Sequence, residues 1–324
     1  MEVKNKRKKW IGVLGCFLAI LGLTFWFMRS DVTRERHIVL IVKSVDKTTD
    51  FWKSMIDGAN MAAREYDVRL IVMGPESETK YEEQGAMIEE AIRMKPDAIA
   101  LAPASYTKTA SYAEKIEKSN IKLMLVDSVM EEVMGSCVVA TDNVEAGRKM
   151  GNFIKENAED IRGIGVVGHV QGSSTAAERE TGLRNGLEEY EDNIVDVVFC
   201  DSDYRKAYKV TKELLEKHPE INVLAGLNEY SSVGAARAVV DLGLEGKIFM
   251  VGFDSSLKEV DFLEAEVFQA IVVQKPLNMG YLAIENTVRL LDEEVLPQYI
   301  DSGSALITKE TMYMPENQKL LFPL

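Results

Sequence analysis

Short apolar runs alternate with amphipathic stretches along most of this chain, and this alternation constrains the fold more than any other feature. The apolar runs have the length of buried strands. The stretches between them have the length of helices and carry apolar residues at three- and four-residue spacing. Continuous apolar strands joined by helices are typical of parallel sheets that are covered on both faces. The sequence therefore predicts an α/β protein.

The alternation occurs twice, which predicts two similar lobes with parallel sheets. The first series has expected strands at 37–42, 68–73, 97–101, 121–126 and near Val138, and the second at 163–167, 194–199, 223–225 and 247–251. We assign 37–141 plus about 275–305 to an N-terminal lobe, and 142–274 plus about 306–324 to a C-terminal lobe. A late helix at 277–291 and the tail from Pro297 would cross between the lobes and make the hinge multi-stranded.

The N-terminus has the pattern of a transmembrane anchor. Residues 10–28 carry no charge and follow a basic segment, 1–9, which contains Lys4, Lys6, Arg7, Lys8 and Lys9. At about 1.5 Å per residue, a helix of this length just spans a hydrocarbon core of about 30 Å. The basic flank belongs on the cytoplasmic side, so the short linker 29–36 and everything after it would lie outside the cytoplasm.

Two other interpretations of this segment stay open. A cleavable signal peptide needs small residues at its processing site, and residues 25–28 (Phe-Trp-Phe-Met) provide none. Residues 13–16 (Val-Leu-Gly-Cys) loosely resemble a lipidation motif at Cys16. The apolar run is short before Cys16, however, and continues for twelve residues beyond it. We therefore favour the uncleaved anchor.

Charge and cysteine content exclude some classes of protein. The chain has a formal net charge of −14. The first 28 residues have a net charge of +4, so the remainder has a net charge of −18. So acidic a body would repel phosphates, which argues against nucleic acid as a partner. The three cysteines form no Cys-x-x-Cys pair, and we expect no disulfide framework.

Polar residues follow several of the expected strands directly. Asn228, Asp254 and Gln274 each come just after an apolar run, and Asp127 ends the run 121–126. Ligands of open α/β sheets bind at the carboxyl ends of the strands. Amides and carboxylates together supply the donors and acceptors that neighbouring sugar hydroxyls need. These residues therefore predict a cleft for a polyol, although Asp127 could equally serve a turn or a helix cap.

Two further candidates lie on helices. Phe51 and Trp52 are adjacent in the first long helix, and neighbours in a helix point about 100° apart. Both cannot face the same core, so at least one is available to cover the apolar face of a sugar ring. Arg179 lies in the helical run 176–180, where a solvated or interlobe salt bridge is an alternative to ligand binding.

A catalytic function has little support in the sequence. Gly163, Gly165 and Gly168 match Gly-x-Gly-x-x-Gly, but they lie within an apolar run instead of the turn that a dinucleotide site requires. An NAD-dependent sugar-modifying enzyme is therefore the least favoured reading. The sequence has no recognisable nucleophile, general base or metal cluster. We expect no enzyme activity, no cofactor and no metal.

Taken in order, these residues resemble the type I periplasmic sugar-binding proteins, the ribose-binding-protein-like group that is related to LacI-type effector domains. The likeness runs from about His37 to Leu306. Its elements are 51–59 (Phe-Trp-Lys-Ser-Met-Ile-Asp-Gly-Ala), Leu-Val-Asp127, Thr141-Asp142-Asn143, Ala-Ala-Glu-Arg179-Glu-Thr-Gly182, Leu-Asn228-Glu, Val-Gly-Phe-Asp254 and Gln274-Lys-Pro.

The resemblance implies two Rossmann-like lobes, three hinge crossings and a mono- or small oligosaccharide between the lobes. It implies ring stacking for Phe51 and Trp52 and hydroxyl binding for Asp127, Asn228, Asp254 and Gln274; Arg179 would bind ligand or be structural. Ala177 and Ser202 depart from the ribose-binder pattern, as does the loop 46–50, so the sugar stays open. The partner would be an ABC permease or, alternatively, a membrane histidine kinase for which the protein is a sugar-sensing co-receptor.

Overall fold

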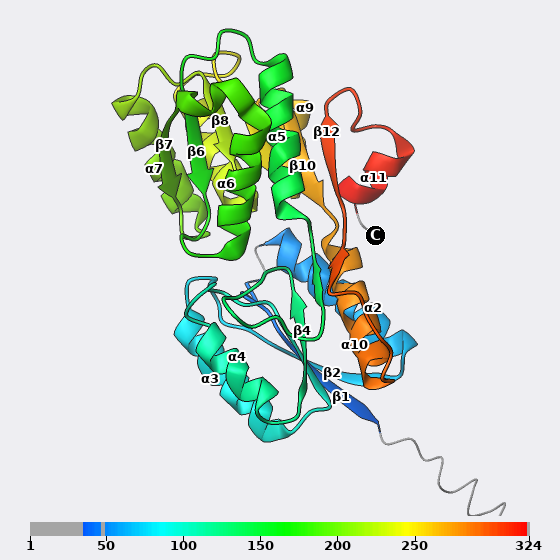
Figure 1. Cartoon of the computed structure of the whole chain (residues 1–324). Helices are drawn as coiled ribbons and strands as arrows, with labels where there is room; N and C mark the ends of the chain where they lie inside the picture. Colours follow the sequence, from blue (N-terminus) through cyan, green and yellow to red (C-terminus); the bar gives the residue numbers. More distant parts are fainter. Residues whose placement is uncertain (1–34, 47–48, 323–324) are drawn as a thin grey trace, which may run out of the picture. The chain divides into compact units, whose positions relative to one another are not determined.

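Two six-stranded sheets organise the chain. A computed structural model describes residues 35–46 and 49–322, and His37–Leu324 form one compact unit. In the first sheet the strand order is β11-β5-β4-β3-β1-β2, and in the second it is β12-β10-β9-β8-β6-β7 (Figure 1). The first sheet contains β1 (Arg36–Ile41), β2 (Val68–Met73), β3 (Ala98–Leu101), β4 (Lys122–Val126), β5 (Val138–Ala140) and β11 (Tyr299–Asp301). The second contains β6 (Ile164–Gly168), β7 (Ile194–Phe199), β8 (Val223–Gly226), β9 (Phe249–Phe253), β10 (Ala270–Gln274) and β12 (Ser304–Thr308).

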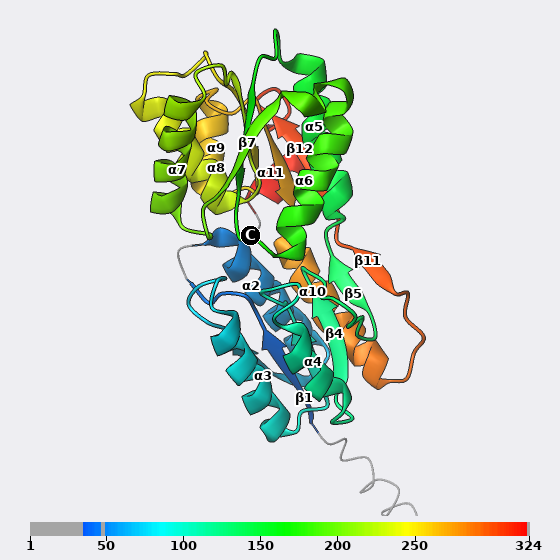
Figure 2. The same cartoon turned by 60° about the vertical axis from the view of Figure 1, so that its left-hand side comes forward.

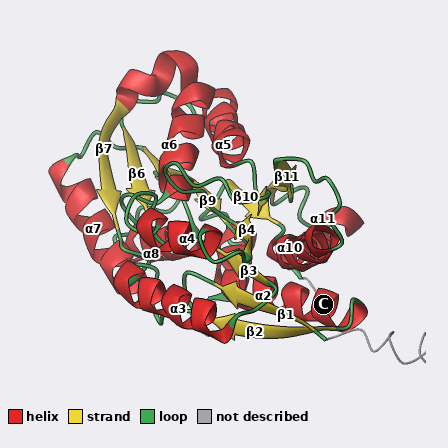
Figure 3. Ribbon diagram, turned by 60° about the horizontal axis from the view of Figure 1, so that its bottom comes forward, coloured by secondary structure: helices red, strands yellow, loops and turns green. Residues whose placement is uncertain are grey.

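The two sheets are parallel, with β12 as the antiparallel edge strand of the second. Helices cover both faces of the strands (Figure 3). In the N-terminal lobe these are α2 (Asp50–Glu65), α3 (Tyr81–Met94), α4 (Ala110–Glu117) and α10 (Pro276–Leu291). In the C-terminal lobe they are α5 (Asn143–Asn157), α6 (Ser174–Leu187), α7 (Tyr204–Lys217), α8 (Glu229–Asp241), α9 (Leu257–Glu264) and α11 (Pro315–Leu321), with a 3₁₀ helix, η1 (Glu188–Asn193), after α6.

The apolar strands fill two cores per lobe because successive side chains point to opposite faces of a sheet. On β1, Ile38 and Leu40 pack with the core under α2 and α10, while Val39 and Ile41 pack with the core under α3 and α4. Helices α2 and α10 approach closely: a Cβ on Gly280 would lie 1.9 Å from the carbonyl oxygen of Met55. This fold confirms the predicted α/β class and the pairing of parallel sheets with flanking helices.

The chain passes between the two sheets three times. The crossings follow β5 at Thr141, follow β10 at Lys275 and join β11 to β12 at Ser302 (Figure 2). The hydroxyl of Thr141 donates to Gln274 Oε1 at 2.9 Å and lies 3.3 Å from Ser302 Oγ, so one side chain ties the three crossings together. Strand β12 begins at Ser304, two residues before the expected boundary at 306; the lobe boundaries themselves stay predictions.

Most expected elements are present within three residues of their predicted ends. The glycine-rich run is the buried strand β6, as expected, because Gly165 packs against leucine side chains of its neighbours. Sequence periodicity gave no prediction for α9, β11, β12 and α11, which are short or lie at the edge of a sheet. Cys137 and Cys200 are free and buried.

The predicted anchor, 10–28, and Cys16 lie outside the described residues. Within 35–46 and 49–322, no helix is long and apolar enough to cross a membrane.

Candidate functional site

Side chains from both lobes line a narrow cleft at the carboxyl ends of the strands. All seven residues singled out in the sequence lie there. The lining consists of Lys43, Thr49, Phe51, Trp52, Glu78, Asp127, His169, Thr175, Arg179, Asn228, Glu229, Tyr230, Asp254 and Gln274. The space left between them is about 30 Å³, which is room for one or two water molecules. A sugar therefore requires the lobes to open first.

The two strand-end acids occupy equivalent places in the two lobes. Asp127 follows β4 and Asp254 follows β9. Each of these strands is the third in its sheet, counted from the edge strand β11 in the first sheet and from β12 in the second. Each backbone N–H donates to the neighbouring strand, Asp127 to Val139 O at 2.9 Å and Asp254 to Val272 O at 2.8 Å. Both residues have left-handed backbones, with φ of 64° and 86°. A left-handed backbone is uncommon for residues other than glycine, and aspartate adopts it more readily than most.

Asp254 is held by donors that carry no charge. Its Oδ2 accepts from the backbone N–H of Glu229 at 2.9 Å, and its Oδ1 accepts from Gln274 Nε2 at 2.7 Å. Gln274 Oε1 in turn accepts from Thr141. Both ends of the Gln274 amide thus have protein partners, so in this closed arrangement Gln274 orients Asp254.

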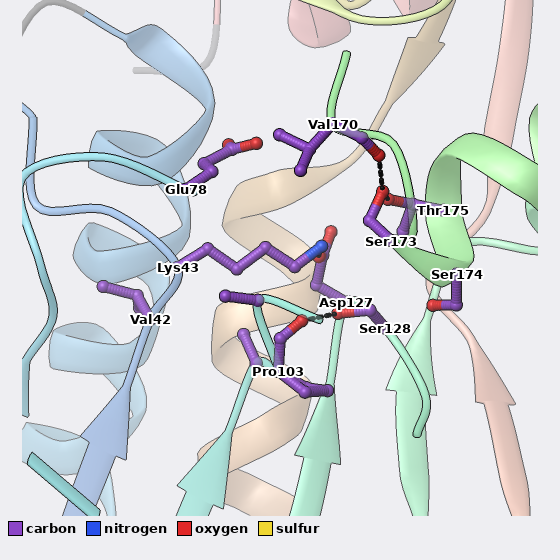
Figure 4. A network of polar contacts seen from close by, with 12 residues as sticks. Val42, Lys43, Glu78, Pro103, Asp127, Ser128, Val170, Ser173, Ser174 and Thr175 are labelled. Carbon is purple, nitrogen blue, oxygen red and sulfur yellow. Dashed lines mark hydrogen bonds and ion pairs between the residues drawn. The ribbon is translucent and has the colours of Figure 1, made fainter. Parts of the chain in front are cut away.

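Asp127 forms a buried ion pair with Lys43. The Lys43 Nζ lies 2.7 Å from Asp127 Oδ2, and both side chains are 4% exposed. Figure 4 shows the lysine side chain reaching toward Asp127 from the end of β1. Asp127 is the N-cap of none of the described helices, and its part in ligand binding stays a prediction.

Arg179 is buried within the C-terminal lobe, so the solvated alternative is wrong. Its Nε donates to Asn143 Oδ1 at 2.9 Å and its Nη1 donates to Leu227 O at 2.8 Å. The guanidinium lies 3.9 Å from the centre of the Phe253 ring. Arg179 therefore braces the start of α5 against the end of β8 while it also lines the cleft.

Asn228 has a second role that the sequence did not indicate. It is the N-cap of α8, and its Oδ1 accepts from the Ser231 N–H in a reciprocal capping box. This leaves Nδ2, which lies 3.5 Å from Ser202 Oγ, as the group that a ligand could use.

The adjacent aromatics differ in burial, but both contact the same core, contrary to the expectation that two helix neighbours could not do so. Trp52 is 2% exposed, packs in the core, and donates from Nε1 to Glu78 Oε1 at 2.7 Å. Phe51 is half-buried and stands edge-on to Trp52, with ring centres 5.0 Å apart. Phe51 is thus the better placed of the two to cover a sugar ring.

Sequence reasoning missed several lining residues. Lys43 follows β1 and His169 follows β6, so the strand-end rule that found Asp254 also covers them. Glu229 and Tyr230 follow Asn228 directly, and Thr175 is the second residue of α6, so each of them reads as an ordinary first-turn residue of a helix. Glu78 lies in the loop after β2, where no periodic pattern marks it.

Three buried acids of the C-terminal lobe repel one another. Burial raises the pKa of Glu229 to about 8; a hydrogen bond from Tyr204 opposes this and the charge of Asp254 adds to it. Burial also raises the pKa of Asp254, against the attraction of Arg179, and raises the pKa of Glu259 well above its usual range. Negative charge on these three side chains is therefore energetically costly in the C-terminal lobe.

His169 is neutral by the same physical cause. Burial and the nearby charges of Arg179 and Lys43 hold its pKa well below the ordinary value. Its Nε2 lies 2.9 Å from Thr175 Oγ1. The neutral imidazole of His169 can therefore form hydrogen bonds in the cleft without adding a charge.

The lobes touch directly across the cleft. Ser202 Oγ donates to Glu78 Oε2 at 2.6 Å, and the Tyr106 N–H donates to Gly172 O at 3.0 Å. The Val129 N–H donates to Ser174 Oγ at 3.1 Å, and Thr49 hydrogen-bonds Tyr230. A larger cavity of about 650 Å³ adjoins the cleft and shares its residues Phe51, Glu229, Asp254 and Gln274. It extends along α2 to the start of α10 and to α11.

The fold and this cleft agree with the comparisons to known proteins. Residues 38–294 match the family described as periplasmic binding protein domain. The chain belongs to this family. Among the periplasmic binding proteins it is ribose-binding-protein-like, as the sequence indicated. Its relatives are named as binding and transport proteins, which agrees with the expectation of a protein that is not an enzyme.

Three relatives illustrate the range of similarity. A sugar transporter from Clostridium phytofermentans is 44% identical. The match covers 85% of this periplasmic binding protein and all of the transporter chain, with a TM-score of 0.80. A solute-binding protein of an ABC transporter from Agrobacterium vitis, with bound D-fucose, is 26% identical over 88% of this chain and all of its own, with a TM-score of 0.82. The ribose import binding protein of Bacillus subtilis is 22% identical over 88% of this chain and 92% of its own.

Proposed function

We propose that this protein binds a sugar reversibly between its two lobes and performs no chemistry on it. The observation that carries the proposal is the convergence of Asp127, Asn228 and Asp254 with the ring of Phe51 in one interlobe cleft. Carboxylates and amides bind vicinal hydroxyls, while an aromatic ring covers the apolar face of the sugar. Of the seven predicted residues, the proposal assigns ligand contacts to Phe51, Asp127, Asn228 and Asp254, and it assigns the support of these contacts to Trp52, Arg179 and Gln274.

The relatives support a monosaccharide as the ligand. Their names and bound molecules include ribose, D-allose, D-arabinose and D-fucose. Several are binding proteins of ABC-type import systems. We therefore place this chain outside the cytoplasm as the capture component of an ABC-type sugar importer.

Membrane anchoring through 10–28 is part of the proposal. The linker 29–36 has eight residues. At roughly 3.3 Å per residue it reaches less than about 27 Å, which would keep the binding lobes close to the bilayer. Such a position suits a partner in the same membrane. If the protein serves transport, that partner is an ABC permease. If it is instead a sugar-sensing co-receptor, the partner is a membrane histidine kinase.

Crosslinking in native membranes separates the two partners. The full-length chain would be crosslinked in membranes with and without its cognate sugar and then extracted. The proteins crosslinked to it would be identified. Sugar-dependent recovery of a permease supports transport, and recovery of a kinase without a permease ends that reading. Retention of the chain in membranes after alkaline washing tests the anchor, and release into the wash contradicts it.

A further inference from the structure

Acidic side chains outnumber basic ones in the lining of the cleft. Glu78, Asp127, Glu229 and Asp254 line it, against Lys43 and Arg179. Lys43 is committed to Asp127. The hydrogen bonds to Glu78 and Asp254 come from a tryptophan, a serine, an amide side chain and a backbone N–H, none of which carries charge.

Among these acids, Glu229 has an incomplete set of hydrogen-bond partners. Its side chain is 2% exposed and lines both the cleft and the adjoining cavity. One carboxyl oxygen meets the Tyr204 hydroxyl, whereas Oε2 is buried with no hydrogen-bond partner among the described residues. A buried acceptor left unpaired is costly, and in native proteins such a group calls for a partner such as a water molecule or an ion.

The groups that face the Glu229 carboxyl come from several elements. Asp254 follows β9, Glu259 lies on α9, and Asp50 begins α2; all three are acids that repel its negative charge. The Phe51 N–H at the start of α2 and the hydroxyl of Tyr204 favour the charged form. A cation placed beside Oε2 would relieve the repulsion from every one of these acids at once.

We infer that the sugar carries an amine, whose ammonium group binds between the carboxylates of Glu229 and Asp254. The inference rests on the proposed function and names its ligand class. An ammonium group has three donors, enough to meet Glu229 Oε2 and the free lone pairs of Asp254 together. Phe51 and Tyr230 also line the cleft, and the face of an aromatic ring attracts a cation.

A metal ion fits this place less well. The described part of the chain contains no group of three or more His, Cys, Asp or Glu side chains arranged to hold a metal ion. An organic ammonium needs only two carboxylates and an aromatic neighbour, which this corner of the cleft supplies.

Binding would release a proton. In the closed structure, burial raises the pKa of Glu229 to about 8, so this carboxyl is largely protonated near neutral pH. When the ammonium group arrives, the carboxyl loses its proton to the buffer and the ammonium keeps its own. A neutral sugar gives no such release.

Calorimetry on the full-length chain tests the inference. The probes are glucose and galactose, their 2-, 3- and 6-amino-deoxy forms, and the N-acetylated forms of these amines. We expect one amino sugar to bind about tenfold or more tighter than its hydroxyl and N-acetyl counterparts. Its heat of binding should depend on the ionisation enthalpy of the buffer. Glu229→Gln should lose both the preference and the buffer dependence, while Glu216→Gln, an exposed acid of α7 changed in the same way, should keep both.

Each other outcome has a definite meaning. Neutral sugars that bind as tightly as every amine overturn the inference and leave the proposed function standing. A preference for an amine that persists in Glu229→Gln overturns the assignment to this residue. Absence of binding by every sugar overturns the proposed function, and the inference falls with it.

Discussion

Gln274 donates a hydrogen bond of 2.7 Å from Nε2 to Asp254 Oδ1, while its Oε1 accepts from Thr141 in the hinge. The same amide therefore links a carboxylate of the cleft to the point where the chain crosses between lobes. A ligand that holds Asp254 would favour the hinge conformation in which these bonds are intact. Closure and binding are thus coupled through contacts that differ between the open and closed states.

Hinge motion gives the first prediction. The closed cleft has no room for a sugar, so the unliganded chain must populate an open state and the ligand should deplete it. Spin labels at Lys108→Cys and Gln171→Cys, on exposed loops beside the Tyr106–Gly172 contact, should report a long, broad distance distribution without sugar and a short, narrow one with it. A Cys16→Ser background avoids labelling Cys16. Identical distributions at saturation would contradict the hinge.

Phe51 and Trp52 should respond differently to truncation. Trp52→Ala removes a large core side chain and the partner of Glu78, so it should lower the free energy of unfolding by about 3–5 kcal/mol. Phe51→Ala should weaken sugar binding by about 1–2 kcal/mol through lost ring stacking and change stability less. Chemical denaturation and calorimetry on both variants check this. Equal stability losses, with unchanged affinity in Phe51→Ala, would refute the division of roles.

These residues also show how far sequence reasoning reaches. Strand-end positions found Asp127, Asn228, Asp254 and Gln274 because a parallel sheet gathers the carboxyl ends of its strands at one edge. The same rule covers Lys43 and His169, which follow β1 and β6. Glu78 could not be predicted, since only the tertiary structure brings its loop to Trp52 and Ser202. The cap role of Asn228 and the shared protein contacts of Gln274 depend in the same way on partners distant from the strand-end pattern.

The Lys43–Asp127 pair yields a stability prediction. Lys43→Met leaves a buried carboxylate without its cation, and loss of one partner of a buried ion pair costs about 3–5 kcal/mol. The double variant Lys43→Met/Asp127→Leu should recover part of that loss, because no uncompensated charge remains. Denaturant unfolding of the two variants beside wild type measures this. A single variant as stable as wild type would show that the pair is not buried in solution.

The pH dependence of stability follows from Glu229. Its raised pKa means that the folded state holds a proton between about pH 4.5 and 8 that the unfolded state releases. The resulting stabilisation is fully present below about pH 4.5, declines as the pH rises from there, and is lost above about pH 8. Between about pH 5 and 8 the melting temperature of unliganded wild type should fall more steeply with rising pH than that of Glu229→Gln. The control Glu216→Gln should keep the wild-type slope, and equal slopes for wild type and Glu229→Gln would contradict the raised pKa.

The central claim is that sugar binds between Asp254 and the aromatic and polar groups opposite it. Titration calorimetry of the full-length chain against pentoses, hexoses and their amino forms tests it most directly, with Asp254→Ala as the variant and Asp261→Ala, an exposed acid of α9, as the matched control. We expect wild type and the control to bind the same sugar, and Asp254→Ala to lose about 2–4 kcal/mol of affinity, because the groups that Asp254 satisfies are left unpaired. Undiminished binding by a folded Asp254→Ala protein would contradict the account.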